Sequence, residues 1–77
     1  MDVKVLGPGC RNCETLERHT REALEQLGIE ASIEKVTDPV EIVGHGVMAT
    51  PALLVDGELV TSGKVPNVRR LVRLLGG

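Results

Sequence analysis

The chain is 77 residues long, 42% of them hydrophobic, and it contains no Phe, Trp or Tyr. This length allows a single domain over residues 1–77, with a small core of aliphatic side chains. The net charge of −2 and the lack of aromatic side chains argue against a nucleic-acid-binding protein, because such proteins usually have a basic surplus and aromatic stacking platforms.

The first half of the sequence predicts a strand, a long helix and a second strand. Residues 3–6 form an apolar run that ends at a Gly-Pro-Gly loop sequence. From Cys10 to the stop signal Gly28 the pattern is helical, because apolar or small residues recur every three or four positions. These residues are Cys13, Leu16, Thr20, Ala23, Leu24 and Leu27. Residues 30–34 then alternate polar and apolar, as in a strand covered on one face.

The second half predicts two further helices. Asp38 followed by Pro39 is a typical helix start, with Asp38 as the N-cap and Pro39 at the first helical position. Gly44 and Gly46 keep this helix short. Pro66 is expected to open the last helix, whose apolar stripe is Val68, Leu71, Val72 and Leu75.

The same half also predicts a hairpin that completes a four-stranded sheet. Residues 52–55 are apolar throughout, and Asp56-Gly57 predicts a two-residue turn to a partner strand over residues 58–62. The order of elements is strand, helix, strand, helix, strand, strand, helix, which predicts an α/β fold with helices on both faces of a mixed sheet. The first β-α-β unit should be parallel and right-handed, and the most apolar strands, residues 3–6 and 52–55, should lie at the centre.

Two cysteines, Cys10 and Cys13, carry the strongest chemical signal in the sequence. The N-terminus has no signal-peptide pattern, and no apolar run approaches the roughly 20 residues of a membrane helix. We therefore expect a cytoplasmic protein that does not contact a membrane. In that reducing compartment a Cys-x-x-Cys pair is more often catalytic or metal-binding than structural.

Cys10 is the expected nucleophile of this pair. An ordinary cysteine with a pKa of about 8.5 is only about 3% ionised at pH 7. Cys10 lies where the loop meets the predicted helix, so unpaired backbone N–H groups favour its thiolate by about 0.3–1 kcal/mol, and Arg11 adds to this effect. Cys13, almost one turn later on the buried face, is expected to resolve the mixed disulfide that Cys10 forms with a substrate.

Other interpretations use the same two sulfurs. Inert packing of two buried cysteines would not explain a glycine-rich loop directly before a helix. A structural zinc site needs four ligands, and only His19 and His45 remain as soft donors. A soft-metal carrier for Cu(I) or zinc also places Cys-x-x-Cys at a strand–helix junction, but such carriers run strand, helix, strand, strand, helix, strand. A redox-sensing interaction module would form the disulfide without turning over a substrate.

Three features together resemble the thioredoxin-like superfamily, and more closely its small, glutaredoxin-like "redox-active disulfide" proteins of archaea and bacteria. They are Cys10-Arg11-Asn12-Cys13 after the first strand, Met48-Ala49-Thr50-Pro51 before the third, and the Asp56-Gly57 hairpin. With the element order they cover nearly the whole chain. The resemblance implies a minimal thioredoxin-like fold, a cis Thr50–Pro51 peptide facing the cysteines, and thiol–disulfide exchange with protein substrates.

The resemblance also implies a substrate surface and an electron donor. The backbone of Thr50 would pair with an extended segment of the substrate, as in strand addition. The residues expected to bind the substrate are Thr50, Pro51, Ala49 and Arg11. A thioredoxin-reductase-like flavoprotein or glutathione would reduce the protein, which we expect to be a monomer that needs no cofactor and no metal.

Three positions depart from the thioredoxin pattern. Thioredoxins proper have an aromatic residue just before the first cysteine, where this chain has Gly9. They also have a buried carboxylate on the first strand that helps to move the proton of the second cysteine, whereas this chain has Lys4. The Arg-Asn pair between the cysteines is neither the thioredoxin nor the glutaredoxin dipeptide. The direction of exchange and the proton route for Cys13 therefore stay open.

Overall fold

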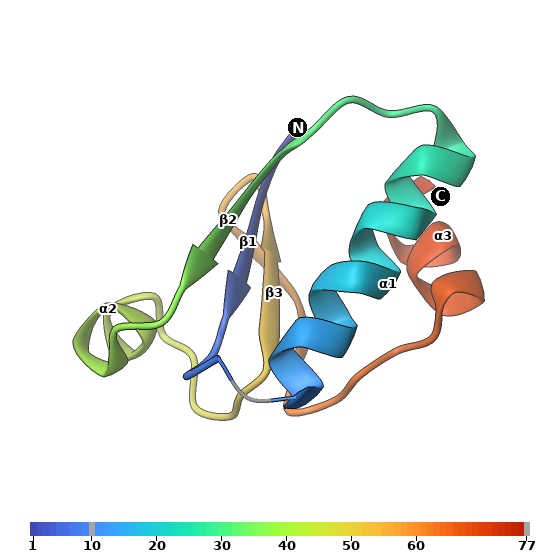
Figure 1. Ribbon diagram of the computed structural model, residues 1–77. Helices are drawn as coiled ribbons and strands as arrows, with labels where there is room; N and C mark the ends of the chain where they lie inside the picture. Colours follow the sequence, from blue (N-terminus) through green and yellow to red (C-terminus); the bar gives the residue numbers. More distant parts are fainter. Residues whose placement is uncertain (10, 77) are drawn as a thin grey trace.

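The computed structural model describes residues 1–9 and 11–76 of the chain. Within these residues the elements follow the predicted order of strand, helix, strand, helix, strand, strand and helix (Figure 1). They are β1 (Asp2–Leu6), α1 (Arg11–Leu27), β2 (Ser32–Val36), α2 (Pro39–Gly44), β3 (Ala52–Val55), β4 (Glu58–Ser62) and α3 (Val68–Gly76). The predicted α/β class is confirmed. None of the helices in these residues is long and apolar enough to cross a bilayer.

The four strands form one mixed sheet in the order β2-β1-β3-β4. β1 runs parallel to β2 and antiparallel to β3, and β4 is antiparallel to β3. The two most apolar strands are therefore central, as predicted from their composition. β3 and β4 are joined by Asp56 and Gly57, which both have positive φ angles, 51° and 84°, as a two-residue hairpin turn requires.

The hairpin turn also fixes the start of the chain. The Asp2 backbone N–H donates to the Asp56 carboxylate at 2.8 Å, and the Asp56 N–H donates to the Asp2 carbonyl at 2.7 Å. On the other side of β1, the Ser32 N–H donates to the Met1 carbonyl at 2.9 Å. Hydrogen bonds on both sides thus hold the beginning of the first strand in place.

Helices cover both faces of the sheet, as the element order predicted. α1 and α3 lie side by side on one face, and α2 lies on the other (Figure 1). The core between α1, α3 and the sheet consists of Val3, Val5, Leu16, Ala23, Leu24, Leu53 and Leu71. The second, smaller core beneath α2 consists of Leu6, Val36, Ile42, Val47, Ala52 and Leu54.

The second strand begins two residues later than predicted. The prediction covered residues 30–34, whereas β2 runs from Ser32 to Val36. Gly28 ends α1 with a φ of 67°, and the chain needs the next three residues to return to the sheet. Ile29 and Ala31 are half-buried in this connection because both pack against the main core. Their apolar character therefore comes from the crossover and not from a strand.

The last helix also begins later than predicted, at Val68 and not at Pro66. The Asn67 side-chain oxygen accepts a hydrogen bond from the Arg70 backbone N–H at 2.9 Å, which is the usual bond of an N-cap. Pro66 is buried outside the helix, and its carbonyl lies 2.9 Å from Nδ1 of His19 on α1. At its other end α3 reaches Gly76, which packs against Leu27, the last residue of α1.

Leu71 and Leu74 on α3 provide a matched test of the main core. Leu71 is fully buried, whereas Leu74 is 41% exposed. We expect Leu71→Ala to lower the free energy of unfolding by about 2–5 kcal/mol, because it leaves a cavity between the helices and the sheet. Leu74→Ala should change it by roughly 1 kcal/mol or less. Urea unfolding followed by far-ultraviolet circular dichroism measures both, and equal effects would contradict this description of the core.

Candidate active site

The predicted cysteine pair lies at the start of α1. Cys10 is outside the described residues, and Arg11, the next residue along the chain, is the exposed first residue of the helix. Cys13 is in the first turn and is buried, with 6% of its surface exposed. Its side chain faces the sheet together with Leu16 and Thr20, so the helical pattern in the sequence identified its face correctly.

Gly7, directly after β1, brings Cys13 and Pro51 together. Its backbone N–H donates to the Val36 carbonyl at 2.9 Å, which keeps it in line with the sheet. A Cβ atom at Gly7 would collide with Sγ of Cys13 and would lie 3.8 Å from Cα of Pro51. The sulfur therefore packs against the glycine backbone, with the proline beside it. In the sequence, Gly7 indicated only a loop, and its role in this packing was missed.

The Thr50–Pro51 peptide bond is cis, as the family resemblance implied. Pro51 is buried, whereas Ala49 and Thr50 are exposed. Two hydrogen bonds, one on each side of Thr50, join this loop to the end of β4. The Gly63 N–H donates to the Pro51 carbonyl at 2.8 Å, and the Ser62 hydroxyl donates to the Ala49 carbonyl at 2.9 Å. Thr50 and Ala49 are thus presented to solvent by a loop with a fixed shape.

An apolar hollow adjoins Thr50 and extends to α2. Its lining residues are Pro8, Thr37, Pro39, Ile42, Val43, Val47, Met48 and Thr50. Met48 is 97% exposed and Val43 is 71% exposed, although both are large and apolar. The hollow joins the loop before α1 to the loop before β3. Sequence reasoning used Met48 only as part of a motif and did not identify this surface.

A small cavity of about 50 Å³ lies on the α1 side of the sheet, next to Cys13. Its lining residues are Val5, Gly7, Gly9, Cys13, Glu14, Glu17, Lys35 and Thr37. Glu17 and Lys35 form an ion pair with an O–N distance of 2.9 Å, and the Glu17 side chain is only 13% exposed. The second oxygen of Glu17 accepts a hydrogen bond from Arg21 at 2.9 Å.

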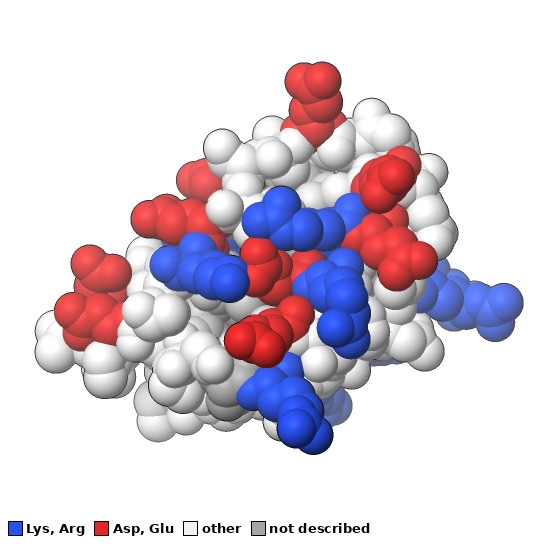
Figure 2. Space-filling model, in the orientation of Figure 1, with Lys and Arg blue, Asp and Glu red and all other residues white. Residues whose placement is uncertain are grey.

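These contacts keep Glu17 ionised. The hydrogen bond from Lys35 holds the pKa of the Glu17 carboxyl below its usual value, partial burial opposes this shift, and Arg21 adds to it. Acidic and basic side chains are interspersed over the face that β2 and α1 present (Figure 2). The position of Glu17, four residues after Cys13, is a signal that sequence reasoning could have used, whereas Lys35 was outside the predicted strand and had no such signal.

Lys4 has no part in this cavity. It pairs in register with Glu34 on β2 and with Leu54 on β3, while its neighbours Val3 and Val5 belong to the core beneath α1. Because side chains alternate along a strand, Lys4 faces the side of the sheet that carries α2. The charged groups next to Cys13 therefore come from α1 and β2.

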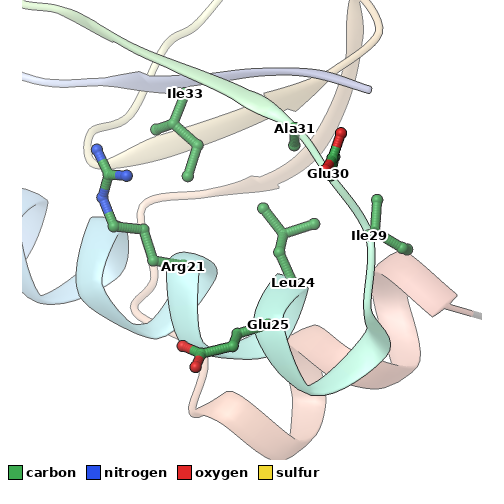
Figure 3. A pocket seen from close by; sticks show the side chains of 7 residues that line it. All are labelled: Arg21, Leu24, Glu25, Ile29, Glu30, Ala31 and Ile33. Carbon is green, nitrogen blue, oxygen red and sulfur yellow. The ribbon is translucent and has the colours of Figure 1, made fainter.

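Another depression lies at the C-terminal end of α1, where the chain turns from the helix toward β2 (Figure 3). Its lining residues are Arg21, Leu24, Glu25, Ile29, Glu30, Ala31 and Ile33. This surface contains no cysteine or histidine and is separated from Cys13 by more than two turns of helix. It does not extend the candidate site.

Side chains that bind metals are spread over the fold. Among residues 1–9 and 11–76, no three His, Cys, Asp or Glu side chains are grouped so that they could hold an ion. His19 lies against the Pro66 carbonyl, and His45 follows the last turn of α2. Neither histidine lines the small cavity next to Cys13.

Comparison with known proteins assigns the chain to a family. Residues 1–76 match the family described as thioredoxin domain. A protein named thioredoxin from Methanothermobacter thermautotrophicus is 40% identical over 75 residues, which cover 97% of each chain. Another protein named thioredoxin, from Methanocaldococcus jannaschii, is 38% identical over 69 residues, which cover 90% of this chain and 79% of the relative.

The family match and the observed fold agree. The four-stranded mixed sheet with three helices in the described residues is the minimal thioredoxin-like arrangement that the sequence resemblance implied. The two relatives support a thiol–disulfide oxidoreductase role in general terms. We conclude that this chain belongs to the thioredoxin domain family of the thioredoxin-like superfamily.

Proposed function

We propose that this protein exchanges its dithiol with disulfides of protein substrates through the sequence Cys10-Arg11-Asn12-Cys13. Cys10 is the nucleophile, Cys13 is the resolving thiol, and the loop Ala49-Thr50-Pro51 holds the substrate. The observation that carries the proposal is the packing of the buried Cys13 sulfur against Gly7, with Pro51 beside them. This packing places the second cysteine of the pair next to the loop that presents Thr50.

The start of α1 supports the division of roles between the two cysteines. Cys10 precedes the first helical residue, Arg11, so the backbone N–H groups of the first turn and the helix dipole favour a thiolate there. Cys13 is buried and therefore shielded from a large substrate. Attack by the thiolate of the first cysteine followed by resolution from the second thiol is the usual sequence for such a pair.

The reaction balances in two steps. The Cys10 thiolate attacks one sulfur of the substrate disulfide, so a Cys10–substrate bond forms and the first substrate sulfur leaves as a thiolate. Cys13 then attacks the Cys10 sulfur, so the Cys10–Cys13 bond forms and the second substrate sulfur leaves. Two electrons pass from the dithiol to the substrate, and the two cysteine protons end on the released thiols.

Substrate binding uses exposed backbone and an apolar surface. Thr50 and Ala49 are exposed on a loop of fixed shape, which suits pairing with an extended segment of the substrate. The hollow beside Thr50, with the exposed side chains of Met48 and Val43, would accept apolar side chains of that segment. Arg11, the exposed first residue of α1, completes the proposed set of substrate-binding residues. The electron donor is a flavoprotein reductase or glutathione, and the protein acts as a cytoplasmic monomer.

Replacing each cysteine separately tests the roles. Cys10→Ser should abolish the reduction of insulin disulfides, because the attacking sulfur is lost. Cys13→Ser should retain the attack but accumulate a mixed disulfide with the substrate, since no thiol resolves it. Turbidity of reduced insulin reports the activity, and non-reducing gels report the trapped complex. Full activity in both variants would contradict the proposal, as would a trapped complex with Cys10→Ser and none with Cys13→Ser.

Gly7→Ala tests whether the contact between glycine and sulfur matters for the exchange. The added methyl group would overlap Sγ of Cys13, so the sulfur has to shift away from residue 7. We expect a loss of about 1–3 kcal/mol in stability from overpacking and a lower rate of insulin reduction. Gly44→Ala is the matched control, because a Cβ there meets no atom within 4 Å. Equal activity of the two variants would show that the contact has no role.

A further inference from the structure

We propose that Glu17 accepts the proton of Cys13 through a water molecule in the adjoining cavity, and that Lys35 positions the Glu17 carboxylate for this transfer. The inference rests on the proposed exchange reaction, because it concerns the step in which Cys13 becomes a nucleophile. It supplies a proton route in a chain that has Lys4, on the other face of the sheet, at the position of the thioredoxin carboxylate.

The elements that meet at Cys13 bring an acid and a base to the same cavity. Glu17 follows Cys13 by four residues on α1, so both side chains lie on one face of the helix, one turn apart. Lys35 on β2 is paired in register with Val5 on β1, and Val5 lines the cavity together with all three side chains. The ion pair therefore forms part of the lining that this cavity shares with Cys13 and the Gly7 backbone.

The size of the cavity and the polar groups on three of its lining residues suit a bridging water. Its volume of about 50 Å³ exceeds the 10–15 Å³ that one water molecule needs. A buried water needs two to four polar partners, roughly, and the Glu17 carboxylate, the Lys35 ammonium and the Thr37 hydroxyl are on residues that line the space. A water here would connect the thiol of Cys13 with the carboxylate of Glu17.

The proposed step balances within the exchange reaction. The Cys13 S–H bond breaks as the water accepts its proton and passes one of its own to a Glu17 oxygen. The resulting Cys13 thiolate attacks the sulfur of Cys10, and the bond between Cys10 and the substrate breaks. The proton on Glu17 then returns to solvent at the charged face of the molecule, and the released substrate thiolate takes up a proton there.

The charge state of Glu17 makes it available as an acceptor. Lys35 and, more weakly, Arg21 hold the pKa of the carboxyl below its usual value, so it is ionised at neutral pH. The other titratable groups that face it across the cavity are Glu14 and Cys13 itself. A negative charge near a thiol disfavours its thiolate at equilibrium, so a carboxylate that acted only by its charge would slow Cys13. Proton transfer and simple repulsion therefore predict opposite effects when Glu17 is made neutral.

The variant Glu17→Gln distinguishes proton transfer from charge repulsion. Reduced protein is mixed with 2,2′-dipyridyl disulfide, and thiopyridone release is followed by stopped flow. The first phase reports attack by Cys10, and the second reports resolution by Cys13. We expect the second phase to slow at least about tenfold near neutral pH, the first phase to stay within about twofold, and the difference to vanish at alkaline pH, where hydroxide forms the thiolate. Glu22→Gln, on the exposed face of α1, should match the wild type.

Lys35→Gln provides a second test with a separate readout. The second phase depends on ionised Glu17, so its rate falls as the pH drops through the pKa of that carboxyl. Lys35 lowers this pKa, so its removal should move the acid limb of the profile to higher pH. The rate of the second phase is measured from about pH 4 to about pH 9. Lys4→Gln removes the same charge from the other face of the sheet and should leave the limb in place.

The outcomes separate the relay from the underlying reaction. A wild-type protein that releases only one thiopyridone, or none, overturns the proposed exchange itself. Two phases in the wild type, with an unchanged or faster second phase in Glu17→Gln, overturn the relay alone. If Glu17→Gln does not fold, as judged by circular dichroism, the test rests on Lys35→Gln. An acid limb that does not move in that variant overturns the relay.

Discussion

The close packing of the Cys13 sulfur against the backbone of Gly7 is the contact on which the site depends. It joins the first turn of α1 to the end of β1 at a point where the sheet has no side chain. Because the helix is rigid, this contact also determines where the next turn lies, and so brings Glu17 over β2. Pro51 lies beside the same contact, with its Cα 3.8 Å from the place that a Cβ of residue 7 would take. A residue without a side chain thus determines the relative positions of the helix, the proline loop and the ion pair.

The core that supports this contact is built from aliphatic side chains alone. Two separate clusters lie on the two faces of the sheet, and both include residues of the central strands β1 and β3. Side chains that alternate along β1 and β3 supply both clusters, so the central strands couple the packing of α1 and α3 with that of α2.

Much of the fold was predictable from local patterns. The apolar composition of residues 52–55 identified a central strand, and the Asp56-Gly57 pair identified the turn, because each depends on a few neighbouring residues. The limits of β2 and α3 were wrong. Ile29 is apolar because it packs in a crossover and not in a strand. Asn67 caps α3, whereas Pro66 was expected to open this helix. Both errors come from packing that the sequence does not display.

The candidate site was predictable to a smaller extent. The buried position of Cys13 follows from helical periodicity, and the cis bond before Pro51 followed from the family resemblance. The ion pair between Glu17 and Lys35 joins two elements, and it exists because the register of β2 places Lys35 opposite Val5. A strand ending at residue 34, as predicted, would have left Lys35 in a loop. Pairings of this kind depend on register, which single-sequence patterns specify poorly.

The hydrogen bonds between Asp2 and Asp56 have a consequence for how the molecule can be joined to others. They hold the first residues of β1, at the end of this strand that is remote from Gly7. Gly76 packs against Leu27 at the C-terminal end of α1, whereas Arg11 begins that helix (Figure 1). A helix of 17 residues is about 25 Å long, so this end of α3 is remote from the cysteine loop. A tether, a surface or a second domain attached at either of these points would leave Thr50 and the apolar hollow open to large partners.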